Sequence, residues 1–158
     1  KDSIIAAKID KDLIVNGVIT PRNSVKVMVN EGRVLLTGKV SDIEKGKKVY
    51  ECAWKTKGVV EVIDEVDIGH KKLEAADFTS YFTDFYLIAK IKSKLFFNKE
   101  VTAADFKITS KKGNVYVFGV AKDDYQMEET LSVISKTIGV KKVINHAILK
   151  DDSRRRSS

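Results

Sequence analysis

The chain has 158 residues, of which 43% are hydrophobic and 32% are charged, and its net charge is +7. That length suits one ordinary domain or two very small ones, and the many Val, Ile, Leu and Phe residues exclude a largely disordered chain. The single cysteine excludes a disulfide scaffold within the chain, and no apolar run approaches the roughly 20 residues needed to span a bilayer.

The positive charge is concentrated in the second half of the chain. Residues 1–70 contain 12 Lys and Arg against 11 Asp and Glu, whereas residues 71–158 contain 17 against 11. Half of the second excess lies in the run Arg154–Arg156, within a polar basic tail at 151–158. A basic half-chain fits nucleic acid, anionic lipid, an acidic protein or simply a solvated surface.

The first 69 residues predict the order helix, strand, strand, helix, strand. Apolar residues at helical spacing follow Asp2, which we expect to cap the N-terminus of the first helix. Alternating valines at 25, 27 and 29, a turn at 30–32 and the apolar run at 34–36 predict a hairpin. The remaining predicted elements are a helix at 43–57 that follows Asp42 and ends at Gly58 as its C′ residue, and a strand at 59–68.

The same order recurs in the second half, which identifies an internal repeat. The turn glycines Gly32, Gly38 and Gly58 recur, all shifted by 81 positions, as Gly113, Gly119 and Gly139. A first helix headed by Asp84 precedes a hairpin, a helix at 124–138 and a strand at 140–149. We therefore predict an α+β fold of two tandem domains, each a three-stranded sheet with two helices on one face. Their predicted bounds are 1–69 and 81–150, with a short linker at 70–80.

This pattern resembles the BON domain family. The resemblance rests on DFYLIAKIKSKL at 84–95, KGNVYVFG at 112–119 and IGVKKV at 138–143, with counterparts at 30–38 and 57–62, and it extends over nearly the whole chain. It implies tandem αββαβ domains of the kind found in dual-BON lipoproteins of the Gram-negative outer membrane. Proteins of that type are anchored by an acylated N-terminal cysteine, which this chain does not contain.

The resemblance also implies a function. Dual-BON lipoproteins bind anionic phospholipid, chiefly through the first helix of the second domain, and support the outer-membrane barrier. We accordingly expect a non-enzymatic protein of the periplasm, attached to the inner leaflet of the outer membrane, with envelope proteins as further partners. No cofactor, metal or nucleic acid is expected.

The first helix of the second repeat has the composition of a membrane-contact helix. Aromatic rings suit the headgroup boundary, and lysines near an anionic surface contribute about 1 kcal/mol each. The corresponding helix of the first repeat has no aromatic residue and carries Asp10 and Asp12. Tyr86 occupies the position at which the resembled lipoproteins carry a membrane-facing tryptophan. The candidate lipid-binding residues are Phe82, Phe85, Tyr86, Lys90, Lys92 and Lys94.

Two other interpretations of these residues stay open from the sequence. Phe85, Phe96 and Phe97 could form an aromatic seam with the partner domain, or they could belong to the core of their own domain. The lysines could simply form a solvated face.

Catalysis has little support in the sequence. The only histidines, His70 and His146, are not at equivalent repeat positions, and no metalloprotease, paired-cysteine or nucleophile-elbow motif is present. Cys52 lies on an amphipathic helix and is predicted to be a small buried residue. The alternative functions are a soluble periplasmic module that binds proteins in a chaperone-like manner, and an adaptor for envelope assembly factors.

Overall fold

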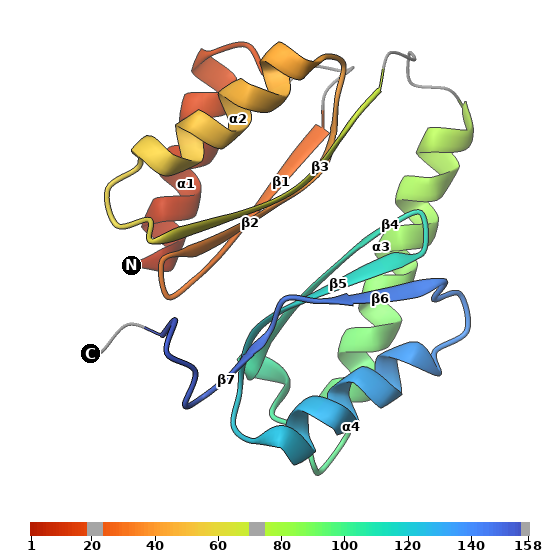
Figure 1. The fold of residues 1–158 in the computed structure, drawn as a ribbon. Coiled ribbons are helices and arrows are strands. Elements are labelled where there is room, and N and C mark those ends of the chain that lie inside the picture. Colours follow the sequence, from red (N-terminus) through yellow and green to blue (C-terminus); the bar gives the residue numbers. More distant parts are fainter. Residues whose placement is uncertain (19–23, 70–74, 156–158) are drawn as a thin grey trace. The chain divides into compact units, whose positions relative to one another are not determined.

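A computed structural model describes residues 1–18, 24–69 and 75–155 of the chain. It divides into two units, Lys1–Leu73 and Glu74–Ser158 (Figure 1). The elements of the first unit are α1 (Asp2–Val15), β1 (Ser24–Asn30), β2 (Arg33–Val40), α2 (Ile43–Lys55) and β3 (Glu61–Ile68). Those of the second are α3 (Ala75–Phe96), the 3₁₀ turn η1 (Ala103–Asp105), β4 (Phe106–Lys111), β5 (Asn114–Ala121), α4 (Asp124–Ser135), β6 (Lys142–Asn145) and β7 (Ile148–Leu149).

Each unit has a mixed sheet whose central strand pairs antiparallel with one neighbour and parallel with the other. The order is β1-β2-β3 in the first unit and β4-β5-β6 in the second, where β7 also pairs with β5. The two helices of each unit cover the same face of its sheet (Figure 1). The predicted α+β fold class is therefore confirmed.

The core of each unit lies between its helices and its sheet. In α1 the buried residues Ile5, Ile9 and Leu13 follow helical spacing. In the second unit, Leu87, Ile91 and Leu95 of α3 have the same spacing. Alternate residues of the central strand, such as Val34 and Leu36 of β2, complete the same cluster because side chains alternate across a strand. Burial of these stripes fixes which side of each helix faces outward.

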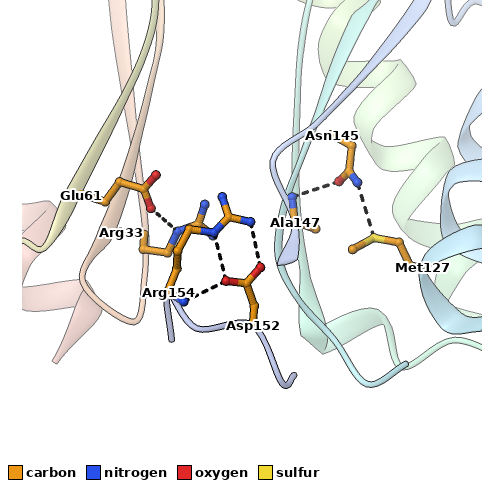
Figure 2. Close-up of polar contacts among 7 residues, drawn as sticks. All are labelled: Arg33, Glu61, Met127, Asn145, Ala147, Asp152 and Arg154. Carbon is orange, nitrogen blue, oxygen red and sulfur yellow. Dashed lines mark hydrogen bonds and ion pairs between the residues drawn. The ribbon is translucent and has the colours of Figure 1, made fainter. Parts of the chain in front are cut away.

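The last strand of the second unit differs from its prediction. It is divided into β6 and β7, so this sheet has four strands rather than three. At the division the Asn145 side-chain oxygen accepts a hydrogen bond from the backbone N–H of Ala147 at 2.9 Å (Figure 2). Asp64 accepts from the N–H of Val66 at 3.0 Å in the same way, without dividing β3. Such local side-chain bonds compete with ladder hydrogen bonds for backbone N–H groups.

The acids that precede the core stripes of α1 and α3 have a role that the sequence did not predict. Asp2 and Asp84 are not N-caps. The Asp84 carboxylate accepts hydrogen bonds from the N–H groups of Lys112 and Gly113, at 2.7 and 3.0 Å, and from the Ser110 hydroxyl. Asp2 likewise accepts from the N–H groups of the other hairpin turn, at 2.8 and 3.0 Å.

These bonds hold two-residue hairpin turns in place. All four turn residues, at 31–32 and 112–113, have positive φ, which is the type I′ geometry. Further along each central strand, a Cβ on Gly38 would lie 1.9 Å from the Ser24 carbonyl oxygen of β1. A Cβ on Gly119 would lie 2.1 Å from the carbonyl oxygen of Asp105, which directly precedes β4. Glycine is therefore required at both strand positions.

Several predicted boundaries were wrong. Helix α3 begins at Ala75, so residues 75–80, predicted to be linker, are helical. The helices α2 and α4 end at Lys55 and Ser135, two to three residues before the predicted ends. Gly58 and Gly139 are consequently not C′ residues: each stands in a turn that leads into the last strand. His70, Arg156 and residues 70–74 of the predicted linker lie outside the described residues.

Candidate lipid-binding site

The buried face of α3 fixes the orientation of the helix. Leu87, Ile91 and Leu95 are almost fully buried. The Asp84 carboxylate accepts hydrogen bonds from the hairpin turn between β4 and β5. The helix is therefore held against the sheet by its core stripe along the last three turns and by a charged anchor at Asp84. Described residues on its opposite side, such as Phe82, Phe85 and Phe96, are exposed.

A stripe of aromatic side chains occupies this outward side. Phe82, Phe85 and Tyr86 are 76%, 75% and 68% exposed. Phe96 lies on the same side about four turns after Phe82, about 21 Å further along the helix axis, and is also exposed. Large rings are normally buried, so this exposed row is a candidate interaction surface.

Phe96 and Phe97 are exposed and pack edge to face on each other, with ring centroids 5.2 Å apart. Neither they nor Phe85 belong to the core of their own domain, which was one of the interpretations left open by the sequence. Phe96 is not among the lipid-binding candidates predicted from the sequence. Its helical spacing from Phe82 and Phe85 is the signal that could have placed it there.

Lysines flank the aromatic stripe on both sides. At 100° per residue, Lys92 projects beside Phe85 on one flank, and Lys90 and Lys94 project on the other. Lys92 and Lys94 are exposed. Between residues 82 and 97 the only acid is Asp84, which is buried, so this surface of α3 carries positive charge alone.

Lys90 differs from the other two lysines. It is partly buried, its Nζ donates a hydrogen bond to the backbone oxygen of Ile138 at 2.8 Å, and it lies 5.6 Å from the centroid of the Tyr86 ring. One of its three donors is thus used to hold the loop after α4 against α3. Lys90 orders the site in addition to supplying charge.

The loop held by Lys90 adds an apolar side chain that the sequence analysis missed. Ile138 is 85% exposed, and a Cβ on the next residue, Gly139, would lie 3.5 Å from Leu87 of α3. The equivalent position in the first unit is Lys57. That contrast between the repeats is the sequence signal for Ile138, since a large apolar residue replaces a charged one in an exposed turn.

Helix α1 provides an internal comparison. Its residues Ser3 and Ile4 stand where α3 has Phe85 and Tyr86, and Asp10 and Asp12 stand where α3 has Lys92 and Lys94. Burial raises the pKa of the Asp10 carboxyl above its ordinary value. The two helices share a buried stripe and an anchoring acid, but only α3 combines exposed rings with cations.

In the described part of the chain, the metal-ligating side chains include one cysteine, which lies in the first unit. No group of three His, Cys, Asp or Glu side chains among the described residues could hold a metal ion. Cys52 is buried, as predicted, and desolvation, followed by the nearby Asp12 charge, raises the pKa of its thiol. None of the described helices is long and apolar enough to cross a membrane.

The BON domain family matches residues 1–70 and 83–151. The chain belongs to this family, with two BON domains. The repeat of elements described above is the structural counterpart of those two matches.

Curated relatives cover both domains. An uncharacterized protein encoded in the gshII 5′ region of Anaplasma centrale is 30% identical over 155 residues, which is 98% of this chain and 99% of that protein. The outer membrane lipoprotein DolP of Haemophilus influenzae is 29% identical over 143 residues, 90% of this chain and 72% of that protein. A 21 kDa hemolysin of Actinobacillus pleuropneumoniae is 25% identical over 143 residues, 90% of this chain and 71% of that protein.

Proposed function

We propose that this chain is a non-enzymatic protein of the bacterial envelope that binds anionic phospholipid through α3 of its second BON domain. Its similarity to an outer membrane lipoprotein over 90% of its length supports the envelope assignment. We further propose a periplasmic location at the inner leaflet of the outer membrane, and a role in outer-membrane integrity.

The observation that carries the lipid proposal is the lysine-flanked row of exposed rings on α3. A helix lying in the bilayer interface needs apolar groups on the side that enters the membrane and cations at the headgroup level on either side of them. Phe82, Phe85 and Tyr86 supply the first, and Lys92 and Lys94 supply the second on opposite flanks. Without a helix that could span the bilayer in the described chain, docking on the surface fits this geometry.

The mechanism is shallow insertion with electrostatic attraction. The rings enter the headgroup boundary, Ile138 enters beside Tyr86, and the lysine ammonium groups meet lipid phosphates. The bond from Lys90 to the Ile138 oxygen keeps the loop in register with the helix, so both insert together. Because the core stripe and Asp84 hold α3 rigidly, little conformational entropy is lost on docking.

Co-sedimentation with vesicles tests this function. The wild-type chain should bind vesicles that contain phosphatidylglycerol or cardiolipin, but not purely zwitterionic ones, and binding should weaken at high salt. A variant that combines Tyr86→Ala, Lys90→Glu and Lys94→Glu should lose this binding. A folded wild type that ignores anionic vesicles, or a variant that binds equally, would reject α3 as the site and favour a protein-binding role.

A further inference from the structure

The second unit carries a group of lysines at one end of its sheet. Lys111 ends β4, and Lys112 lies in the hairpin turn that follows it. Lys141 and Lys142 lie where the loop after α4 enters β6, at the same end of the unit (Figure 1). Lys112, Lys141 and Lys142 are exposed. We call these four residues the turn cluster, and the mechanism proposed for α3 does not use them.

The first unit does not carry this charge at the equivalent positions. Its four residues there are two neutral ones and two acids, namely Asn30, Glu31, Val60 and Glu61. Four positive charges in the second unit thus correspond to two negative charges in the first. Both units form the same turn and the same strand pairing here, so the fold itself does not require lysine at these positions.

The strand register shows how differently the two sheets treat charge at this end. In the first unit, Arg33 of the central strand pairs with Glu61 of β3, and the Arg33 Nε lies 2.6 Å from the Glu61 carboxylate. In the second unit, Asn114 stands in place of Arg33, and its partners on the two neighbouring strands are Lys111 and Lys142. The first row therefore contains its own counterion, whereas the second contains two cations and no acid.

Hydrogen bonds join the turn cluster to α3. The Asp84 carboxylate of α3 accepts a bond from the backbone N–H of Lys112 at 2.7 Å. The backbone N–H of Lys141 donates to the carbonyl oxygen of Gly113 at 2.8 Å, which ties the loop to the turn. The same loop is tied to α3 by the bond from Lys90 described above. The turn, the loop and α3 are therefore held together at one end of the unit.

We propose that the turn cluster contacts lipid phosphates of the same membrane, so that the second unit docks with this end toward the bilayer. The proposal rests on the function proposed for α3. The exposed rings of α3 enter the headgroup boundary, and the turn cluster adds cations that are attracted to the anionic surface beyond the helix. Contacts on different elements fix the tilt of the unit, whereas a single helix would leave it free to roll.

Charge and continuity with α3 select a lipid surface as the occupant. Lysine is a point charge on a flexible stem, so it meets phosphates without a fixed geometry. Exposed lysines on a turn, a loop and a strand end suit a layer of mobile headgroups better than one enclosed anion. Asp84, the acid that the turn contacts, is buried and its carboxylate accepts three hydrogen bonds, so it presents no charge to the membrane.

Vesicle binding by two charge-matched variants of the full chain tests the proposal. Lys141→Glu, Lys142→Glu reverses two exposed charges of the turn cluster. Lys122→Glu, Lys150→Glu makes the same change at the opposite end of the sheet, where the N–H of Lys150 bonds to Ala121, the last residue of β5. We expect the first variant to lose about tenfold or more in affinity for phosphatidylglycerol vesicles at low salt, and the second less than about threefold. An equal loss in both variants, or no loss in the first, would overturn the proposal.

The orientation is measured separately with a fluorescent label at one position. In a Cys52→Ala background, which removes the only native cysteine, Lys112→Cys places the label in the turn and Lys122→Cys places it at the other end of the sheet. On phosphatidylglycerol vesicles that carry nitroxide-labelled headgroups, we expect quenching of the label at position 112 and not of the label at position 122. Equal quenching at both positions, or quenching at position 122 alone, would refute the orientation.

A third variant, Lys92→Asp, Lys94→Asp, separates this proposal from the function proposed for α3. If that variant loses vesicle binding while Lys141→Glu, Lys142→Glu keeps it, α3 docks the protein and the turn cluster has no part in docking. The reverse result would remove α3 from the site and leave the turn cluster as the contact. If Lys141→Glu, Lys142→Glu binds vesicles like the wild type but loses affinity for soluble polyphosphate, the turn cluster serves a soluble anion and the proposal is wrong.

Discussion

Replacing the α3 lysines with the residues that α1 carries at the same positions is the most informative perturbation of the lipid site. The double variant Lys92→Asp, Lys94→Asp copies Asp10 and Asp12 of the first repeat into exposed positions of the second. Each lysine near an anionic surface contributes about 1 kcal/mol, so losing two and adding repulsion of similar size weakens binding by about 2–4 kcal/mol. That is a loss of about 30- to 1000-fold in affinity for phosphatidylglycerol vesicles.

The matched control applies the same charge change to α1. Lys8→Asp, Lys11→Asp alters two exposed lysines of the first unit and lowers the net charge equally. Partitioning is measured with both variants at low and high salt, where screening should bring the wild type toward the α3 variant. If the α3 variant binds within twofold of the wild type, or if both variants lose equally, attraction by α3 lysines is refuted.

Four further predictions concern the stability of the fold. Asp84→Ala leaves buried hairpin N–H groups without an acceptor and should lower the free energy of unfolding of the second unit by about 2–4 kcal/mol in urea titrations, whereas a loss below about 0.5 kcal/mol would contradict the anchoring role. Gly119→Ala should prevent cooperative folding of that unit in calorimetry because of its 2.1 Å clash, while Gly46→Ala should stabilise the first unit by up to about 1 kcal/mol. The backbone N–H at the start of α2, followed by the Lys45 side chain, lowers the pKa of the Asp42 carboxyl below its ordinary value. Because the pKa is lowered in the folded state, the ionised carboxylate stabilises the unit above the ordinary carboxyl pKa, and this stabilisation is lost as the pH falls through the folded value. Asp42→Ser should therefore flatten the decline in stability below about pH 4. Unfolding is followed by Trp54 fluorescence at each pH.

The sequence predicted the repeat and the fold because both are encoded in local patterns. The glycines of the hairpin turns mark positive φ, and the buried stripes of α1 and α3 follow helical spacing. Such signals need no knowledge of distant contacts. The exposed rings Phe82, Phe85 and Tyr86 could be predicted for the same reason, since they lie outside the stripe on the helix.

What the sequence did not predict depends on contacts between distant segments. A carboxylate before a core stripe looks the same whether it caps its own helix or, like Asp84, a turn 28 residues away. Ile138 joins the proposed lipid site only because the loop after α4 lies against α3, where Lys90 holds it.

Depth-dependent quenching of a single tryptophan tests the central claim most directly. In a Trp54→Phe background, which removes the only native tryptophan, Tyr86→Trp places a reporter on α3 and Ile4→Trp places one at the equivalent position of α1. On anionic vesicles that contain brominated lipids, we predict a blue shift and quenching for the reporter at position 86 and neither for the one at position 4. An unquenched reporter at position 86 on vesicles that the protein binds, or stronger quenching at position 4, would contradict docking through α3.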